Sequence, residues 1–130
     1  MSNALIIDDD DLCRMTIRSF LGTEDTEIME ATTGVEGQRY AILYKPDIIF
    51  CDIFMPDQDG LETIRNIRRY SKIVPIVAIS GGGRDRELDY LKHAKLLGAT
   101  YAIPKPLSYN VIKAITSRTG INRVPMQVAV

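Results

Sequence analysis

Short apolar runs alternate along the chain with longer amphipathic stretches. The apolar runs have the length of strands, and those at 47–52 and 74–80 are apolar almost throughout, which is typical of strands buried on both faces of a parallel sheet. Pro75 has no main-chain donor and is therefore expected at the start of its strand. The predicted strands are 5–8, 27–31, 47–52, 74–80 and 99–103.

The amphipathic stretches between these runs have the apolar spacing of helices. Gly22 and Gly98 are the expected C-terminal ends of two helices, Ser108 is the expected N-cap of another, and Pro46 ends a fourth. The predicted helices are 10–22, 33–45, 61–70, 86–97 and 108–118, with a turn at 55–60 and a loop at 81–83. Strands and helices that alternate in this way predict an α/β fold with a doubly wound parallel sheet and right-handed crossovers.

Length and composition narrow the class of protein. A chain of 130 residues with 45% apolar and 25% charged residues is typical of one globular domain. We expect that domain to span 1–120, with 121–130 as a tail that is disordered or packs against the body. The formal net charge of -1 lacks the excess of positive charge that is typical of nucleic-acid-binding domains. The cluster Arg65, Arg68, Arg69 and Lys72 is instead expected on the solvated face and C-terminal end of one helix.

Several features predict a reduced, cytoplasmic protein. No apolar stretch approaches the roughly 20 residues that a membrane span requires, so membrane insertion is not expected. The first residues lack a basic region followed by an apolar core, as a secretory signal would have. Cys13 and Cys51 form neither a disulfide framework nor a paired metal-ligand motif.

Acidic and other polar side chains follow the predicted strands. Asp8 to Asp11 come directly after the run 4–7, and Asp52 follows 48–51. Two later apolar runs end in Ser80 and Lys105. Ligands of open parallel sheets bind outside the carboxyl ends of the strands, so these groups are expected to converge. Acids, a hydroxyl and a lysine in one place indicate a divalent cation and a phosphoryl group.

Asp8, Asp9 and Asp52 are the candidate metal ligands. Mg²⁺ prefers oxygen ligands and usually takes one or two protein carboxylates beside a phosphate. Three clustered carboxylates repel one another, and a cation relieves that repulsion. The alternative is that the aspartates cap the first helix, but Asp10 or Asp11 alone would suffice for a cap.

Asp52 is the candidate nucleophile, because it stands alone after a buried strand and can form an aspartyl phosphate. Lys105 can pair with phosphoryl oxygens as a point charge, and Ser80 can donate to the same oxygens. In a loose phosphoryl-transfer transition state, such positioning and charge neutralisation supply most of the catalysis. The alternative for Lys105 is a solvated loop lysine, but Pro104 and Pro106 flank it and fix its direction.

Four segments together resemble a known family. They are Leu5-Ile6-Ile7-Asp8-Asp9-Asp10, Cys51-Asp52-Ile53-Phe54-Met55-Pro56 with Asp59-Gly60, Ile79-Ser80-Gly81, and Gly98-Ala99 with Lys105-Pro106. In order and spacing they resemble the receiver domain of two-component response regulators, in particular a single-domain, chemotaxis-type regulator, over residues 4 to about 118. The resemblance implies a flavodoxin-like fold whose five strands, numbered along the chain, lie in the order 2-1-3-4-5.

The resemblance also implies a role for each residue of the site. Asp52 is the phosphoacceptor. Mg²⁺ is bound by Asp9, Asp52 and the main-chain carbonyl of Phe54, with Asp8 acting through water. Ser80 is the switch hydroxyl, and Lys105 contacts the phosphate before a peptide bond to Pro106 that is usually cis.

The implied partners are proteins rather than small substrates. A sensor histidine kinase or a histidine phosphotransfer protein donates the phosphoryl group. The fourth helix, fifth strand and fifth helix then present an altered surface to an unknown downstream protein. No DNA-binding or catalytic domain follows Arg118, so we expect the signal to leave by protein contact. The chain is expected to catalyse only its own phosphorylation and dephosphorylation, and it is not expected to be an enzyme that acts on other substrates.

Two positions depart from the common pattern of the family. An aromatic side chain often stands three residues before the lysine, where this chain has Ala102; Tyr101 is adjacent, but alternation along a strand sends it to the opposite face. Phe54, two residues after the acceptor, is bulky, and we hypothesise that it slows the loss of phosphate.

Other functions remain as alternatives. A haloacid-dehalogenase-type hydrolase needs a second acid two residues after its nucleophile, where Phe54 stands. A receiver-like scaffold that works without phosphorylation is supported by Ala102 and opposed by the acids and Lys105. A flavodoxin-type protein shares the architecture, but the fold alone does not carry function. His93 lies in a charged helical stretch and is expected at the surface.

Overall fold

One parallel sheet forms the centre of the molecule. The computed structural model describes residues 2–22, 25–81 and 87–120. Five strands lie in the order β2-β1-β3-β4-β5, and every pair is parallel. The strands are β1 (Ser2–Ile7), β2 (Thr26–Ala31), β3 (Ile48–Asp52), β4 (Ile76–Ser80) and β5 (Tyr101–Pro104). The predicted flavodoxin-like fold and its strand order are confirmed.

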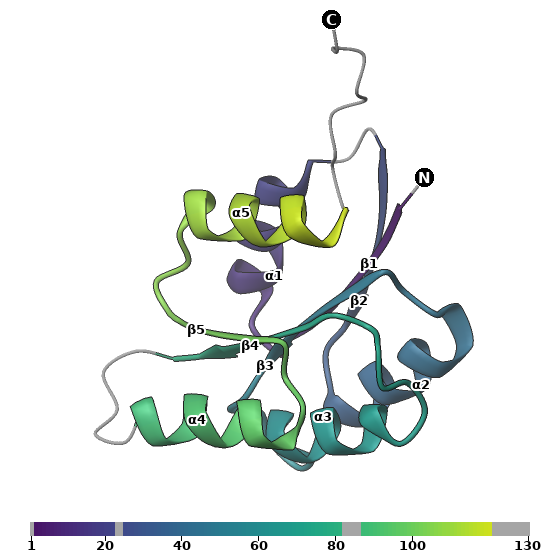
Figure 1. The fold of residues 1–130 in the computed structure, drawn as a ribbon, viewed down its shortest axis with the longest axis vertical. Helices are drawn as coiled ribbons and strands as arrows, with labels where there is room; N and C mark the ends of the chain where they lie inside the picture. The colour runs from purple at the N-terminus through teal and green to yellow at the C-terminus, as the bar shows by residue number, and fades with distance from the viewer. Residues whose placement is uncertain (1, 23–24, 82–86, 121–130) are drawn as a thin grey trace, which may run out of the picture.

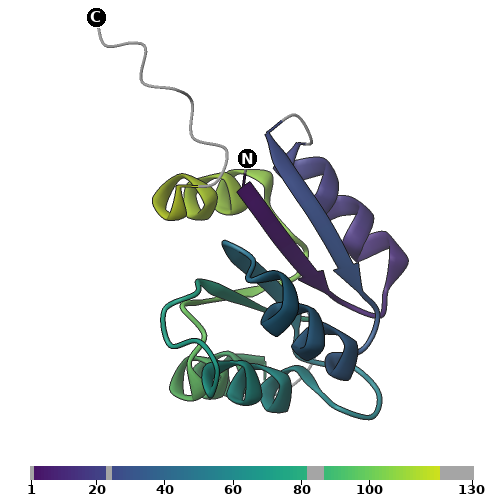
Figure 2. The same ribbon diagram turned by 90° about the vertical axis from the view of Figure 1, so that its right-hand side faces the viewer.

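Helices cover both faces of this sheet, as Figures 1 and 2 show. One face carries α1 (Asp11–Leu21) and α5 (Tyr109–Thr119), while the other carries α2 (Gly34–Tyr44), α3 (Gly60–Arg68) and α4 (Glu87–Leu97). Among the described residues, no helix has the length and apolar character needed to cross a membrane.

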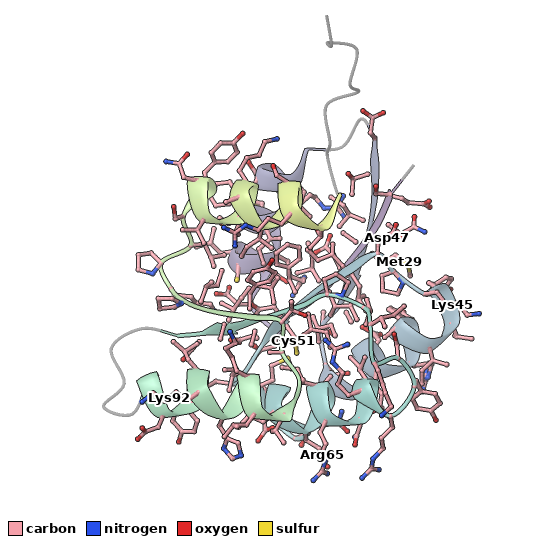
Figure 3. All side chains as sticks on the ribbon, in the orientation of Figure 1. Met29, Lys45, Asp47, Cys51, Arg65 and Lys92 are labelled. Atoms are coloured by element: carbon pink, nitrogen blue, oxygen red, sulfur yellow. The ribbon has the colours of Figure 1, made fainter. Side chains whose placement is uncertain are left out.

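Each face of the sheet has its own hydrophobic core. Ile49 of β3 packs into the core under α2, α3 and α4, whereas its neighbour Phe50 packs into the core under α1 and α5, as alternation along a strand requires. Both side chains are fully buried. Burial of each such side chain contributes about 1.5–3 kcal/mol, so the near-continuous apolar runs of β3 and β4 anchor the fold. The labelled Cys51 lies in this interior, while Arg65 and Lys92 point outward from their helices (Figure 3).

Side-chain caps define where the helices begin. The carboxylate of Asp10 accepts from the main-chain N–H of Leu12 at 3.0 Å, and Ser108 Oγ accepts from Val111 at 3.4 Å. Asp59 caps α3 by accepting from the N–H of Glu62 at 2.9 Å. These bonds satisfy donors that have no partner within the first turn of a helix. Gly98, with φ +123°, follows α4 in a conformation that favours glycine.

Several predicted element boundaries move by one to three residues. Strand β1 begins at Ser2 rather than at Leu5, because Ser2 N–H donates to Asp25 O at 3.0 Å and extends the pairing with β2. Strand β5 begins at Tyr101 rather than at residue 99, because Ala99 N–H still bonds back to Ala94 O at 2.9 Å. The predicted tail at 121–130 and part of the predicted loop at 81–83 lie outside the described residues, and the 1–120 domain boundary stays a prediction.

Arg68 differs from the expectation of a wholly solvated basic cluster. Its guanidinium donates to Gly98 O at 2.7 Å, to Ser71 O at 3.1 Å and to Thr100 Oγ1 at 3.3 Å. Arg65 and Arg69 are exposed, as expected. Arg68 therefore ties the end of α3 to the turn between α4 and β5 instead of facing solvent.

Candidate functional site

The register of the sheet brings the predicted site residues to one edge. Ile7 of β1 pairs with Cys51 of β3, and Asp52 pairs with Ile79 of β4. Ser80 pairs with Pro104 of β5. The residues that follow these pairs, Asp8 and Lys105 among them, therefore all leave the sheet at its carboxyl edge.

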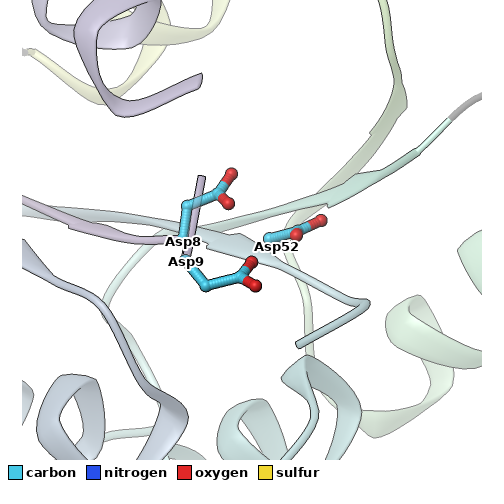
Figure 4. A group of neighbouring side chains, drawn as sticks. All are labelled: Asp8, Asp9 and Asp52. Atoms are coloured by element: carbon cyan, nitrogen blue, oxygen red, sulfur yellow. The ribbon is translucent and has the colours of Figure 1, made fainter. Parts of the chain in front are cut away.

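Three carboxylates meet at this edge. One ligand oxygen each from Asp8, Asp9 and Asp52 lies within 4.8 Å of the other two. Figure 4 shows the three side chains directed into the same space beyond the strands. Asp8 and Asp52 are buried, whereas Asp9 is exposed. The predicted acidic cluster is thus assembled, with a buried side formed by two acids and an open side formed by the third.

Lys105 reaches the same two buried acids. Its Nζ lies 3.7 Å from Asp8 Oδ2 and 3.9 Å from Asp52 Oδ1, within ion-pair distance but beyond a hydrogen bond. The peptide bond from Lys105 to Pro106 is cis, as the resemblance implied. Lys105 N–H donates to Ser80 O at 2.8 Å, which holds the lysine beside the end of β4.

Three buried oxygens of the site lack a hydrogen-bond partner among the described residues. They are Asp8 Oδ2, Asp52 Oδ1 and Ser80 Oγ. A buried polar group without a partner costs about 1–3 kcal/mol, and more when it is charged, so such groups are rare in folded proteins. Two carboxylate oxygens and a hydroxyl that all lack a hydrogen-bond partner at one edge fit a cation and an anion with several acceptor oxygens.

The electrostatics of Asp52 follow from this crowding. Burial, and then the neighbouring carboxylate of Asp8, raise the pKa of Asp52 to about 7. Lys105 and the main-chain N–H of Phe54 act in the opposite direction. Asp52 therefore takes up a proton more readily than an exposed aspartate, and a cation at the site would favour its ionised form.

Lys105 remains charged despite its partial burial. Burial lowers its pKa, but the attraction of Asp52 and Asp8 outweighs that effect, so its pKa is raised. The ammonium is therefore available as a fixed positive charge beside the acids. Such a point charge suits the oxygens of a phosphoryl group.

Arg14 supports the acidic edge and was not identified from the sequence. Its Nη1 donates to Asp8 O at 2.8 Å, and its Nε donates to Glu30 Oε1 at 2.8 Å. It also pairs with Asp11. Arg14 thereby ties the end of β1 to β2 and to the start of α1. The only sequence signal for it was its helical spacing from Asp10 and Asp11.

Cys13 is a second neighbour that the sequence did not indicate. Burial and the nearby Asp8 raise the pKa of this thiol to about 12, so it stays protonated at neutral pH. Burial likewise raises the pKa of Cys51, inside β3. Neither cysteine therefore has the thiolate character of a reactive residue.

The loop after Asp52 is held by close main-chain packing. Gly60 N–H donates to Ile53 O at 2.8 Å. A Cβ on Gly60 would overlap the main-chain oxygen of Asp52. Gly60 thus allows α3 to begin directly beside Asp52, which explains why glycine stands there.

The two unusual positions, Ala102 and Phe54, both lie on the α4 side of the sheet. Ala102 packs against the core under α2, α3 and α4, while Tyr101 packs against the opposite core, so the expected alternation is confirmed. Phe54 packs against Tyr90 of α4 at a ring-centroid distance of 4.8 Å. Tyr90 did not stand out in the sequence, because this contact joins distant segments. His93 is exposed, as expected.

Comparison with known proteins identifies the family. Residues 4–117 match the family model described as the response regulator receiver domain. The chain is 34% identical over 114 residues to the KDP operon transcriptional regulatory protein KdpE of Escherichia coli, covering 88% of this chain and 49% of that protein. It is 31% identical over 102 residues to the chemotaxis protein CheY of Halobacterium salinarum, covering 78% of this chain and 82% of that protein.

A solved structure agrees with these sequence relatives. The structure of the chemotaxis protein CheY4 of Vibrio cholerae superposes with a TM-score of 0.78 at 26% identity, covering 92% of this chain and 98% of that one. The chain spans about half the length of KdpE. On its fold, its acidic edge and these matches, the chain belongs to the response regulator receiver domains of two-component signalling.

Proposed function

We propose that the domain is a phosphoacceptor module in which Asp52 receives a phosphoryl group with the help of Mg²⁺. The observation that carries the proposal is that the buried oxygens Asp8 Oδ2 and Asp52 Oδ1 lie at ion-pair distance from Lys105 but have no hydrogen-bond partner among the described residues. The buried hydroxyl of Ser80, at the end of β4, also lacks one. A metal ion and a phosphoryl group together would supply partners for all of these atoms.

The residues at the edge suit Mg²⁺. Asp9 and Asp52 would bind the ion with the main-chain carbonyl of Phe54, and Asp8 would contact it through water. Carboxylates, a carbonyl and retained waters are the oxygen ligands that Mg²⁺ prefers. The bound ion would neutralise charge on the transferring phosphoryl group.

The transfer uses Asp52 as the nucleophile. A carboxylate oxygen of Asp52 attacks the phosphorus of a phosphohistidine on a sensor kinase or phosphotransfer protein. A P–O bond forms as the P–N bond breaks, and the electron pair returns to the imidazole nitrogen, which then takes up a proton. Lys105 and Ser80 bind the oxygens of the transferred group. Hydrolysis of the acyl phosphate by water reverses the change.

The phosphorylated state would be read by a downstream protein. New bonds to Ser80 and Lys105 would change the ends of β4 and β5, which lie beside α4 and α5. Because the phosphate adds charge at one edge, it can bias the surface formed by α4, β5 and α5 between two arrangements.

Intact-mass spectrometry after incubation with acetyl phosphate and Mg²⁺ tests the proposal. The wild type should gain the mass of one phosphoryl group, and Asp52→Asn should gain none. Asp57→Asn is the matched control, because Asp57 is an exposed acid of the same loop and should be phosphorylated like the wild type.

Two results would contradict the proposal. Equal uptake by Asp52→Asn would place the acceptor elsewhere. A wild type that gains no phosphoryl group from either acetyl phosphate or a histidine phosphotransfer protein would favour a scaffold that works without phosphorylation. A pulldown that captures the same partners with phosphorylated wild type and with Asp52→Asn would favour that scaffold too.

A further inference from the structure

Phe54 and Tyr90 connect the end of β3 to α4 through an aromatic contact. Their ring planes make an angle of 81° at a centroid distance of 4.8 Å, which is an edge-to-face pair. Both rings are half-buried and pack against the core under α2, α3 and α4. The contact therefore joins two segments that are remote in the sequence, and both rings are held in place by packing against this core.

Phe54 also contacts the acceptor residue through its main chain. The N–H of Phe54 bonds to the Asp52 carboxylate and lowers the pKa of that group, against the effect of burial. The ring and the main chain belong to one residue, and Gly60 N–H fixes the preceding carbonyl of Ile53. The contact that holds the Phe54 ring and the main-chain bond that meets Asp52 therefore belong to the same residue, which gives α4 a route to the main chain beside Asp52.

Tyr90 is the largest described side chain of α4 that packs against this core. The others are Leu91 and the small Ala94. On β5, the position that faces the same core is occupied by Ala102, which fills little space. Among the described residues, the Tyr90 ring is the aromatic group of α4 that pairs with Phe54, in the segment directly after β3 and Asp52.

We propose that Tyr90 is a positioning residue for the phosphoryl site, acting through the ring of Phe54. Tyr90 holds Phe54, and Phe54 holds the main chain whose N–H meets Asp52 and whose carbonyl is an expected metal ligand. The inference rests on the proposed function, because it assumes that Mg²⁺ binds beside Asp52. Coupling of this kind is reciprocal, so a change at Asp52 is also felt by α4 through Tyr90.

Selective isotope labelling gives a direct test. The chain has three phenylalanines, so protein labelled with [¹⁵N]phenylalanine shows three amide resonances, from Phe20, Phe50 and Phe54. The Phe54 resonance is followed during titration with Mg²⁺ alone. Tyr90→Phe keeps the ring and should keep the wild-type midpoint. Tyr90→Leu should raise the Mg²⁺ midpoint roughly two- to tenfold, the range that one aromatic pair can supply.

A second aromatic pair provides the matched control. Phe20 and Tyr109 form an edge-to-face pair at 5.5 Å and 77° on the opposite face of the sheet. Tyr109→Leu removes a ring from a contact of the same kind and should leave the Mg²⁺ midpoint unchanged. Tyr90→Gln replaces Tyr90→Leu if the leucine variant does not fold, and the same increase is expected.

The outcomes separate the inference from the function on which it rests. A raised Mg²⁺ midpoint in Tyr90→Leu or Tyr90→Gln, together with an unchanged midpoint in Tyr109→Leu, supports the positioning role. A wild-type midpoint in those Tyr90 variants overturns that role and leaves phosphorylation of Asp52 untouched. A wild-type Phe54 resonance that does not respond to Mg²⁺ overturns both the inference and the metal site, whereas the mass measurement still reports on phosphorylation.

Discussion

Replacing Asp52 by asparagine is expected to change how the stability of the domain depends on pH. In the folded protein the pKa of Asp52 is raised to about 7, first by burial and then by Asp8. In the unfolded chain the same group titrates near its ordinary value of 3.8. Between these values the native carboxyl is protonated while the unfolded one is ionised, so the free energy of unfolding falls as the pH rises through this range.

The size of the effect follows from the same two values. A pKa raised from 3.8 to about 7 corresponds to about 4 kcal/mol at 1.36 kcal/mol per pKa unit. The contribution is fully present below pH 3.8 and is lost as the pH passes 7. Because asparagine does not titrate, the wild type should lose about 4 kcal/mol relative to Asp52→Asn across this range. That is a large part of the 5–15 kcal/mol typical of a folded domain.

Urea unfolding followed by circular dichroism, repeated across the range of pH, measures the difference. Asp57→Asn is the control, because its exposed carboxylate should leave the wild-type pH profile unchanged. If Mg²⁺ binds as proposed, a saturating concentration should stabilise the wild type more at high pH than at low pH, because a cation prefers the ionised carboxylates. Parallel pH profiles for the wild type and Asp52→Asn would refute the argument that burial and Asp8 raise this pKa.

Three further predictions follow from the geometry. Phe54→Asn should shorten the lifetime of the phosphorylated state several-fold, since a smaller polar side chain admits water, and an unchanged rate of dephosphorylation would refute this role. Arg68→Ala should lower the free energy of unfolding by about 1–3 kcal/mol through loss of the bond to Gly98 O, while Arg65→Ala changes it little in urea unfolding. Gly60→Ala should destabilise the fold by about 1–3 kcal/mol, because its Cβ meets main chain that cannot move aside; a melting temperature equal to that of the wild type would contradict this steric argument.

Local sequence signals predicted most of the fold because they were strong and agreed with one another. The runs that became β3 and β4 were apolar almost throughout, so their burial was expected, and Ser108 had the side chain of an N-cap. Strand ends were less well placed, because the start of β1 depends on a bond from Ser2 to Asp25 on the neighbouring chain segment. Such pairing has no signature in the apolar pattern.

The candidate site was predicted where residues follow directly from strands. Asp8, Asp9 and Asp52 meet because parallel strands end at one edge, and Lys105 joins them from β5. Contacts between remote segments could not be predicted in this way. Nothing in the sequence pairs Phe54 with a particular ring of α4, because the match depends on how closely a loop and a helix approach in three dimensions.

The buried oxygens without hydrogen bonds at the carboxyl edge have a consequence for the lifetime of the protein in a cell. Asp8, Asp52 and Ser80 each keep a buried oxygen without a hydrogen-bond partner among the described residues, which leaves the domain less stable than its core alone would allow. A ligand that binds only the folded state raises stability in proportion to the logarithm of its concentration. Degradation by proteases that attack the unfolded chain should then slow when the edge is occupied, so abundance and signalling state would be linked through the same three residues.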